Sequence, residues 1–311
     1  MPKISIITPC YFNELNIPIY AIRLIENEAL FPKNVTFEYI LIDDGSKDLT
    51  WGEMEKFYDQ YPDKVKIIKL VRNFSSTNAV FAALKFATGD CNVIISADLQ
   101  DPPELIPKML DYWLKGHKLV LAHRKGRDEP LFQRFISNLT HSLIRKYGLS
   151  NLPHGGFDLN LFDKEIKETL LSLNEKNSYF PYLLMWLGYD FVTIPYVRQR
   201  RELGHSTYTL SKKIKAFVDS FVAFSFFPIR VISLLGLIMG VLALVYGILV
   251  IGKKLLGIHS PSGWSSMMVV LLFTSAFQML GLGIVGEYVW RTLEAARGRP
   301  NYLIEKVKMR K

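Results

Sequence analysis

Two aspartates stand close together in the stretch "SADLQDPPE", residues 96–104. Asp98 and Asp101 follow the apolar run "CNVIIS" and precede "LIPKMLDYWLKG", so they lie where a buried strand ends and a helix begins. The two prolines of this stretch suit the first turn of that helix. Together with the amide of Gln100, the carboxylate of Asp98 offers hard oxygen ligands that suit Mg²⁺ or Mn²⁺ shared with a substrate diphosphate.

Asp101 has two interpretations that the sequence leaves open. Its carboxylate either contacts a substrate sugar or only caps the helix that begins with "PPELIPKML". Capping explains Asp98 less well, because Asp98 stands further from that helix. The turn "DDGSKD", residues 43–48, is equally ambiguous, since such a stretch is typical of an ordinary turn followed by a helix cap. With Arg72 and residues 11–14 at neighbouring strand ends, it also predicts a pocket whose carboxylates accept hydrogen bonds from a base and a ribose.

The elements that must position these groups alternate along the chain up to about Tyr196. Short β-branched runs predict strands buried on both faces, namely "KISIITP", "FEYILIDD", "VKIIKLV", "NVIISAD" and "HKLVLAH". Stretches with helical periodicity separate them, which predicts a mostly parallel, doubly wound α/β sheet with helices on both faces. Ligands of such sheets bind beyond the carboxyl ends of the strands, and the polar clusters "TPCYFNE", "DDGS", "RNFSS" and "SADLQD" all fall there.

Two long uncharged runs follow this part of the chain. Residues 231–251 comprise 21 residues without a charge, and residues 265–286 supply 22 more. At about 1.5 Å per residue each run covers the roughly 30 Å of bilayer hydrocarbon, which predicts two transmembrane helices rather than two buried core helices. Residues 208–230 mix lysines with many phenylalanines, as expected of an amphipathic helix that lies on the inner leaflet.

Charge and targeting signals agree with a membrane enzyme. The formal net charge is +9, and much of the excess flanks the two spans, which favours an anionic membrane surface over nucleic acid. Basic residues before the first span and after the second predict that both termini are cytoplasmic. Lys253 and Lys254, in the short loop expected outside, are weak evidence against this orientation. The start "MPKISIITPCYFNE" lacks a signal-peptide core. Cys10 and Cys91 show no metal-ligand spacing and are interpreted as core residues.

These motifs, in this order and with two C-terminal spans, resemble the polyprenyl-phosphate glycosyltransferases of the GT-A, family 2 type. That group includes bactoprenol glucosyltransferases and dolichol-phosphate mannose synthase. The resemblance rests on "SIITPCYFNE", "LIDDGSKD", "LVRNFSS", "SADLQDPPE" and "RRELGHSTY", and it extends over essentially the whole chain. It implies a GT-A Rossmann-like domain at 1–207, an amphipathic helix at 208–230, a two-helix membrane domain at 231–290 and a cytoplasmic tail at 291–311.

The resemblance also implies roles for residues on the donor side. The residues implied to surround the nucleotide are Pro9, Tyr11, Glu14, Asp43 and Asp44, with Arg72 beside them. Asp98 and Gln100 match the metal-binding "DADLQ" motif, whose first acid is replaced here by Ser96. A hydroxyl is a poorer ligand than a carboxylate, so the metal keeps one protein ligand fewer. Arg201 matches a diphosphate-binding arginine, and His205 beside it is implied to touch substrate.

On the acceptor side, Arg124 and Arg134 resemble the arginines that hold the acceptor phosphate, with Arg127 as a helper. Asp158, in "GGFDLNLFD", matches the acid of a "GDFRL" motif near the acceptor, and Asn160 stands where that motif has arginine. A lipid phosphate is anionic at neutral pH and needs little help from a general base. Catalysis must therefore come from positioning the reactants and neutralising the leaving diphosphate, with Asp98, Asp158 and Arg201 as the catalytic residues.

The function implied is inverting transfer of one hexose-type sugar, with glucose favoured, from a nucleotide sugar to undecaprenyl phosphate at the inner membrane. Two alternatives are a processive polysaccharide synthase, whose "QxxRW" motif is absent from the sequence, and a catalytically idle membrane scaffold. Ser96, Asn160 and the replacement of a family lysine by Thr207 leave room for the scaffold. Against it, the sequence keeps a set of site residues that a scaffold does not need: Asp98, Gln100, Arg124, Arg134 and Arg201. The resemblance also implies a homo-oligomer, such as a tetramer, and a small membrane flippase as partner.

Overall fold

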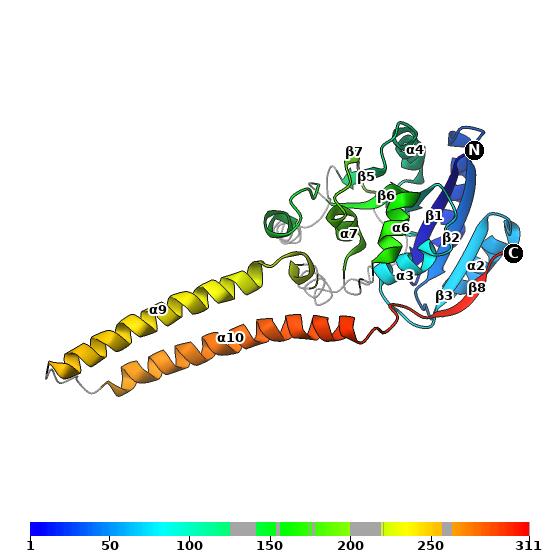
Figure 1. Ribbon diagram of the computed structural model, residues 1–311. Coiled ribbons are helices and arrows are strands. Elements are labelled where there is room, and N and C mark those ends of the chain that lie inside the picture. Colours follow the sequence, from blue (N-terminus) through cyan, green and yellow to red (C-terminus); the bar gives the residue numbers. More distant parts are fainter. Residues whose placement is uncertain are drawn as a thin grey trace. The chain divides into compact units, whose positions relative to one another are not determined.

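The computed structural model describes residues 1–124, 141–153, 156–173, 175, 178–199, 219, 221–256 and 263–310. Two compact units divide the chain. One consists of Met1–Ala223 together with Pro300–Lys311, and the other of Phe224–Arg299. The first unit holds an α/β sheet and the second holds two long apolar helices (Figure 1).

The sheet has eight strands in the order β7-β5-β6-β4-β1-β2-β3-β8. Five strands lie where the apolar runs predict them: β1 (Lys3–Cys10), β2 (Thr36–Asp43), β3 (Val65–Leu70), β4 (Cys91–Ile94) and β5 (Leu119–Arg124). β1 pairs in parallel with β2 and β4, and β2 with β3, so the predicted mostly parallel sheet is confirmed. Three further strands have no counterpart in the predicted elements: β6 (Phe157–Asp163), β7 (Phe191–Tyr196) and β8 (Ile304–Lys308).

The directions of these strands bring their functional ends to one edge. β6 pairs antiparallel with both β4 and β5, so β5 runs in the same direction as β4, and β7 is parallel to β5. The carboxyl ends of β1 to β5 and of β7 therefore share an edge with the start of β6. Every polar cluster singled out in the sequence follows one of these strand ends or lies at the start of β6, which is where an open α/β sheet binds its ligands.

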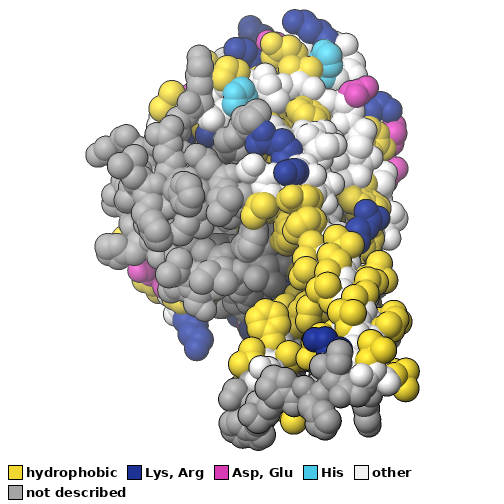
Figure 2. Space-filling view, turned by 90° about the vertical axis from the view of Figure 1, so that its left-hand side faces the viewer, with side chains coloured by type: hydrophobic (Ala, Val, Ile, Leu, Met, Phe, Trp, Pro, Cys, Tyr) yellow, Lys and Arg dark blue, Asp and Glu magenta, His cyan; other side chains and the backbone are white. Residues whose placement is uncertain are grey.

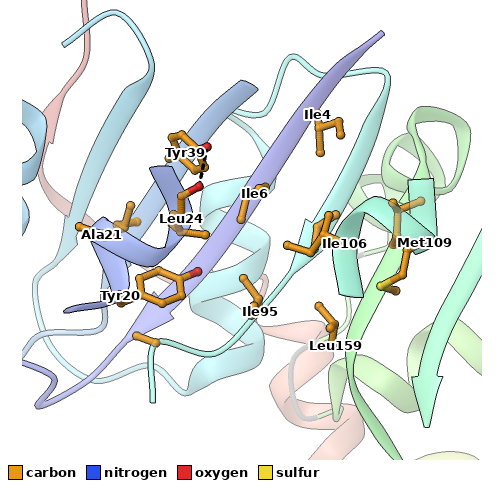
Figure 3. Close-up of a cluster of buried hydrophobic side chains, with 14 of the residues drawn as sticks. Ile4, Ile6, Tyr20, Ala21, Leu24, Tyr39, Ile95, Ile106, Met109 and Leu159 are labelled. Carbon is orange, nitrogen blue, oxygen red and sulfur yellow. Dashed lines mark hydrogen bonds between the residues drawn. The ribbon is translucent and has the colours of Figure 1, made fainter. Parts of the chain in front are cut away.

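Helices cover both faces of the sheet. On one face lie α1 (Ile17–Asn27), α2 (Thr50–Gln60) and α4 (Ile106–Leu114), which follows a short 3₁₀ turn, η2 (Pro103–Leu105). Successive residues of a strand point to opposite faces, so Ile4 and Ile6 of β1 pack toward Tyr20 and Leu24 of α1 and toward Ile106 of α4 (Figure 3). The other face packs against α3 (Ser76–Leu84) and α6 (Lys164–Ser172), while α7 (Phe180–Trp186) follows α6 in the chain.

The C-terminal segment returns to the sheet after the apolar helices. β8 pairs antiparallel with β3, with Val307 opposite Ile68, and the backbone amide of Val71 donates to the carbonyl of Leu303 at 3.0 Å. The strand covers an edge of the sheet that would otherwise expose unpaired backbone groups. All of its side chains are exposed, so β8 lacks the apolar run that signals a buried strand.

The second unit contains α9 (Phe227–Leu255) and α10 (Trp264–Ala296). Both are long and apolar enough to cross a membrane, with mean hydropathies of 2.8 over Phe227–Lys253 and 2.1 over Ser266–Ala296. Neither candidate span is buried, which contradicts the alternative of soluble core helices, and Figure 2 shows hydrophobic side chains covering this unit. The predicted interfacial helix at 208–230 lies largely outside the described residues.

Candidate functional site

The loop after β4 presents two buried aspartates. Asp98 is 5% exposed and Asp101 is 1% exposed. Between them Leu99 has a φ of 59°, a left-handed conformation that is strained for a branched side chain. This turn folds the loop back on itself, and the backbone amide of Gln100 donates to Oδ1 of Asp98 at 3.2 Å. The loop therefore holds both carboxylates at the edge of the sheet.

Asp101 does not cap the helix that follows it, so the capping interpretation is wrong. The 3₁₀ turn η2 begins after Pro102 and has no side-chain cap. Oδ1 of Asp101 instead accepts a hydrogen bond from the hydroxyl of Tyr196, and Oδ2 is buried without a hydrogen-bond partner in the described part of the chain. Burial and the nearby carboxylate raise the pKa of Tyr196, so its hydroxyl stays protonated and donates.

An arginine that the sequence did not single out lies beside three acids. Arg198, just after β7, has its Nη2 3.9 Å from Oδ2 of Asp98 and 3.6 Å from Oδ2 of Asp158, and its Nε 3.7 Å from Oδ1 of Asp101. Its side chain is 25% exposed. The signal available in the sequence was its position three residues before Arg201, which the resemblance assigns to the diphosphate.

Arg124 and Asp158, which the resemblance assigns to the acceptor, form an ion pair between the end of β5 and the start of β6. The side chain of Arg124 is 8% exposed and that of Asp158 is 28% exposed. The hydroxyl of Tyr179 donates to Oδ1 of Asp158 at 3.0 Å, while Arg124 and Arg198 approach Oδ2. Both carboxylate oxygens of Asp158 are thus engaged, and one of them lies beside two arginines.

The donor-side acids lie at the end of β2. Oδ1 of Asp43 accepts from the backbone amide of Ser46 at 2.8 Å, which makes a turn, while its Oδ2 is buried without a hydrogen-bond partner among the described residues. Oδ1 of Asp44 accepts from the backbone amide of Phe74 at 2.7 Å. Burial raises the pKa of Asp43 above its ordinary value and that of Asp44 to about 7. The turn and the pocket interpretations of this segment are therefore compatible.

Gly45 allows the close approach between this turn and the loop after β3. Its φ is +72°, and a Cβ atom there would lie 2.4 Å from the backbone carbonyl carbon of Arg72. The guanidinium of Arg72 lies over the ring of Phe74, 4.0 Å from its centroid, and the side chain is exposed. Arg72 therefore projects from the loop after β3, whose Phe74 amide donates to Asp44.

Residues 11–14 are tied to the turn after β2. The backbone amide of Phe12 donates to the hydroxyl of Ser46 at 3.0 Å, and Oε2 of Glu14 accepts from the backbone amide of Leu49 at 2.8 Å. Glu14 thus contacts the start of α2, a structural contact that the sequence did not predict. Pro9 is opposite Ile42 in the β1–β2 ladder, and Tyr11 is partly buried beside it.

Several predicted site residues lie outside the described part of the chain. These are Arg127, Arg134, Arg201 and His205. The structure brings the other predicted residues to one edge of the sheet, in two groups. One group consists of Asp43, Asp44 and Arg72, and a second group, which Arg198 joins, consists of Asp98, Asp101, Arg124 and Asp158. Cys10 and Cys91 are buried free thiols, as predicted.

The chemistry of Asp98 and Gln100 fits a hard divalent cation that also takes ligands from a substrate. Nε2 of Gln100 donates to the carbonyl of Gln199 at 3.2 Å, so the amide oxygen Oε1 is the atom that can ligate a cation. In the described part of the chain, no group of three or more His, Cys, Asp or Glu residues is arranged to hold a metal by itself. The donor set therefore suits a shared site rather than a closed, all-protein site.

Comparison with known proteins finds glycosyltransferases along most of the chain. Residues 5–171 match the family model for glycosyl transferase family 2. The chain is 32% identical over 304 residues to the bactoprenol glucosyl transferase of Shigella phage SfX, covering 97% of this chain and 99% of that protein. It is 28% identical over 308 residues to the undecaprenyl-phosphate 4-deoxy-4-formamido-L-arabinose transferase of Pectobacterium carotovorum, covering 98% and 93%.

A solved structure of glucosyl-3-phosphoglycerate synthase from Mycobacterium tuberculosis, in complex with Mn²⁺, UDP and phosphoglyceric acid, is 19% identical to this chain. The match covers 70% of this chain and 75% of that one, with a TM-score of 0.48.

Proposed function

Because this chain belongs to glycosyl transferase family 2, we propose that it moves a single hexose-type sugar, with glucose favoured, from a nucleotide sugar to undecaprenyl phosphate. The observation that carries the proposal is the group of Asp98, Asp101, Arg124, Asp158 and Arg198 at the carboxyl edge of the sheet. Alternating carboxylates and guanidinium groups suit a reaction between two phosphate-bearing substrates and a cation. Near-full-length similarity to proteins named for bactoprenol and undecaprenyl phosphate supports this acceptor.

The reaction exchanges one bond to the anomeric carbon for another. A phosphate oxygen of the lipid attacks that carbon from the face opposite the diphosphate, and the bond to the diphosphate oxygen breaks. The nucleoside diphosphate leaves with the electron pair, and the configuration at the anomeric carbon inverts. The nucleophile is already an anion, so no base has to remove a proton.

Within this mechanism the chain positions the reactants and balances their charge. Arg124 holds the acceptor phosphate together with Arg134 and Arg127, and Asp158 orients the guanidinium of Arg124. The nucleotide is surrounded by Pro9, Tyr11, Glu14, Asp43, Asp44 and Arg72. Arg201 and His205 contact the diphosphate end of the donor. Asp98 and Gln100 would hold Mg²⁺ or Mn²⁺, which supplies positive charge to the leaving diphosphate.

The membrane arrangement follows from the acceptor. We place the catalytic domain (1–207) and the tail (291–311) on the cytoplasmic side of the inner membrane, with 208–230 on the leaflet surface and 231–290 crossing twice. α9 and α10 support two crossings by length and composition. Basic residues at both cytoplasmic ends support the orientation. A homo-oligomer such as a tetramer and a small flippase that moves the lipid-linked sugar complete the proposal.

The test is transfer by the purified full-length protein in detergent. It is incubated with undecaprenyl phosphate, Mg²⁺ or Mn²⁺, and a panel of radiolabelled UDP- and GDP-sugars. Wild type is compared with Asp98→Ala and with Asp63→Ala, which removes an exposed acid paired with Arg310 at the surface. We expect one sugar to enter the lipid phase only with metal, Asp98→Ala to be inactive and Asp63→Ala to be fully active. Folded wild type that transfers no sugar would instead favour the membrane scaffold.

A further inference from the structure

The guanidinium of Arg198 lies beside the carboxylates of the acidic loop after β4. Its guanidinium is within 4 Å of carboxylate oxygens of Asp98, Asp101 and Asp158, at 3.9, 3.7 and 3.6 Å. These acids come from two different parts of the sheet edge, the loop after β4 and the start of β6. The guanidinium of Arg198 therefore offsets negative charge on two buried aspartates and on Asp158, which Arg124 also contacts.

The backbone on both sides of Arg198 is fastened to the same acidic loop. The hydroxyl of Tyr196 donates to Asp101, and the amide of Gln199 donates to the carbonyl of Gln100 at 3.0 Å. Nε2 of Gln100 in turn donates to the carbonyl of Gln199 at 3.2 Å. Contacts two residues before and one residue after Arg198 thus hold its backbone against the loop.

We propose that Arg198 is a displaceable counter-ion of this carboxylate cluster, which a divalent cation must push aside to reach Asp98. The inference rests on the proposed function, in which Asp98 and Gln100 bind that cation. Its physical basis is that Nη2 of Arg198 faces Oδ2 of Asp98, an oxygen that a hard cation would use. A guanidinium and a divalent cation repel each other at this range, so binding of one weakens binding of the other.

The donor resolves this competition. A sugar diphosphate brings an anion to the site, and a guanidinium displaced from Asp98 can pair with phosphate oxygens instead. Metal and donor then bind together more tightly than either binds alone. The metal replaces Arg198 at Asp98, and the diphosphate of the donor pairs with the displaced guanidinium. In the absence of donor, Arg198 offsets part of the negative charge of these acids and keeps the affinity for free metal low.

The direct test measures Mn²⁺ binding without donor, by electron paramagnetic resonance of free Mn²⁺ in titrations of the full-length protein in detergent. Arg198→Ala should bind Mn²⁺ about tenfold more tightly than wild type, since a competing charge at short range is removed. Arg198→Lys keeps the charge and should stay close to wild type. Arg23→Ala is the matched control, because Arg23 pairs with Glu104 at 3.4 Å on the surface, and its Mn²⁺ affinity should not change.

A second measurement guards against a variant that is only less stable. Without metal, Arg198→Ala should melt below wild type because Asp98, Asp101 and Asp158 each lose an ionic partner. Mn²⁺ should raise its melting temperature more than that of wild type. Adding Asp98→Asn to Arg198→Ala should abolish both effects. Equal Mn²⁺ affinity in wild type and folded Arg198→Ala would overturn the inference and leave the proposed function intact. Absence of Mn²⁺ binding in every variant, with and without UDP-glucose or GDP-mannose, would overturn the metal assignment itself.

Discussion

The hydroxyl of Tyr179 donates to Oδ1 of Asp158 at 3.0 Å, on the side of the carboxylate opposite the ion pair with Arg124. Tyr179 stands just before α7 and Asp158 at the start of β6, so this bond joins two segments that are separate in the sequence. A carboxylate fixed at both oxygens cannot rotate, and it fixes the guanidinium that it contacts. The positioning of Arg124 therefore depends on a residue outside the predicted set.

Tyr179→Phe tests this positioning role. Loss of one hydrogen bond to a charged acceptor costs about 1.5 to 3 kcal/mol, so kcat/KM for transfer should fall by about ten- to a hundredfold. The fall should appear mainly in KM for the lipid phosphate if Arg124 holds the acceptor. Tyr189→Phe is the matched control, because the Tyr189 hydroxyl donates to Glu165 at 3.1 Å on the exposed surface. A Tyr179→Phe enzyme with wild-type kinetics would contradict the role.

Asp44 should make donor binding depend on pH. Burial raises its pKa to about 7, with hydrogen bonds from the Phe74 and Ser75 amides opposing and Asp43 reinforcing the shift. Above pH 7 the carboxylate accepts hydrogen bonds from the nucleotide, and below pH 7 it is protonated. At pH 6 about a tenth of the molecules carry the charged form, so the apparent Kd for the donor should be about tenfold higher than at pH 8.

The measurement is calorimetric titration with the nucleotide sugar that supports transfer, at constant ionic strength from pH 5.5 to 8.5. Asp44→Asn should bind the donor more weakly at pH 8 and show no step near pH 7. Asp63→Asn, an exposed acid at the surface, should retain the wild-type pH profile. A step that survives in Asp44→Asn would assign the titration to another group.

Glu38 should stabilise the opposite edge of the sheet. Its 2% exposed carboxylate pairs with Lys66 at 2.8 Å and accepts from Ser5 and the Thr88 hydroxyl. Burial opposes ionisation, but these partners outweigh it and lower the pKa of Glu38 to about 2. The folded pKa lies below the unfolded value of about 4.5. The resulting stability of about 3 kcal/mol is therefore present above pH 4.5 and lost as the pH falls toward 2.

Glu38→Gln should lower the free energy of unfolding by about 2 to 3 kcal/mol at pH 7, and the difference from wild type should shrink below pH 4.5. Thermal unfolding of the full chain in detergent at several pH values measures both effects. Glu104→Gln, which removes an exposed partner of Arg23, should change stability by less than about 1 kcal/mol. A pH-independent difference between wild type and Glu38→Gln would exclude the ionised carboxylate as the cause.

β8 should be required for a stable sheet. A chain ending at Asn301 lacks the whole strand and leaves the outer edge of β3 unpaired, while its other edge stays paired with β2. The side chains of Ile67, Ile68 and Leu70 on β3 are fully buried. We expect its melting temperature to fall by at least about 5 °C and its tendency to aggregate to rise. A chain ending at Lys308 keeps the strand and loses only the surface pair of Arg310 with Asp63, so it should behave as wild type. Equal stability of both truncations would show that β8 contributes nothing.

The local pattern of the chain was sufficient for the parallel half of the fold. β1 to β5 are short, β-branched and buried on both faces, so their apolar runs stand out from the amphipathic helices between them. Parallel strands in series place their carboxyl ends together, and this rule alone predicted that Asp43, Arg72 and Asp98 would share an edge. The two uncharged runs predicted the two long apolar helices just as clearly, because a bilayer sets a minimum length for a helix that crosses it.

β6, β7 and β8 could not be predicted in the same way. β8 is exposed along its whole length and follows two apolar helices, so nothing in its own residues indicates that it pairs with β3. β6 runs antiparallel between β4 and β5 because of sheet topology, not because of its composition. Its direction decides that Asp158 faces the acidic loop rather than the far edge.

The sequence by itself determined the chemistry that this protein carries: acids and arginines at strand ends, a donor set of hard oxygens, and two helices for a bilayer. Residue types and short-range spacing encode these properties, since each depends on neighbours within a few positions. Only the tertiary structure decided the partnerships. Arg198 meets Asp98 across 100 residues of sequence, and Asp158 meets Tyr179 and Arg124 from three separate elements. Such contacts depend on strand order and direction, which no local pattern specifies.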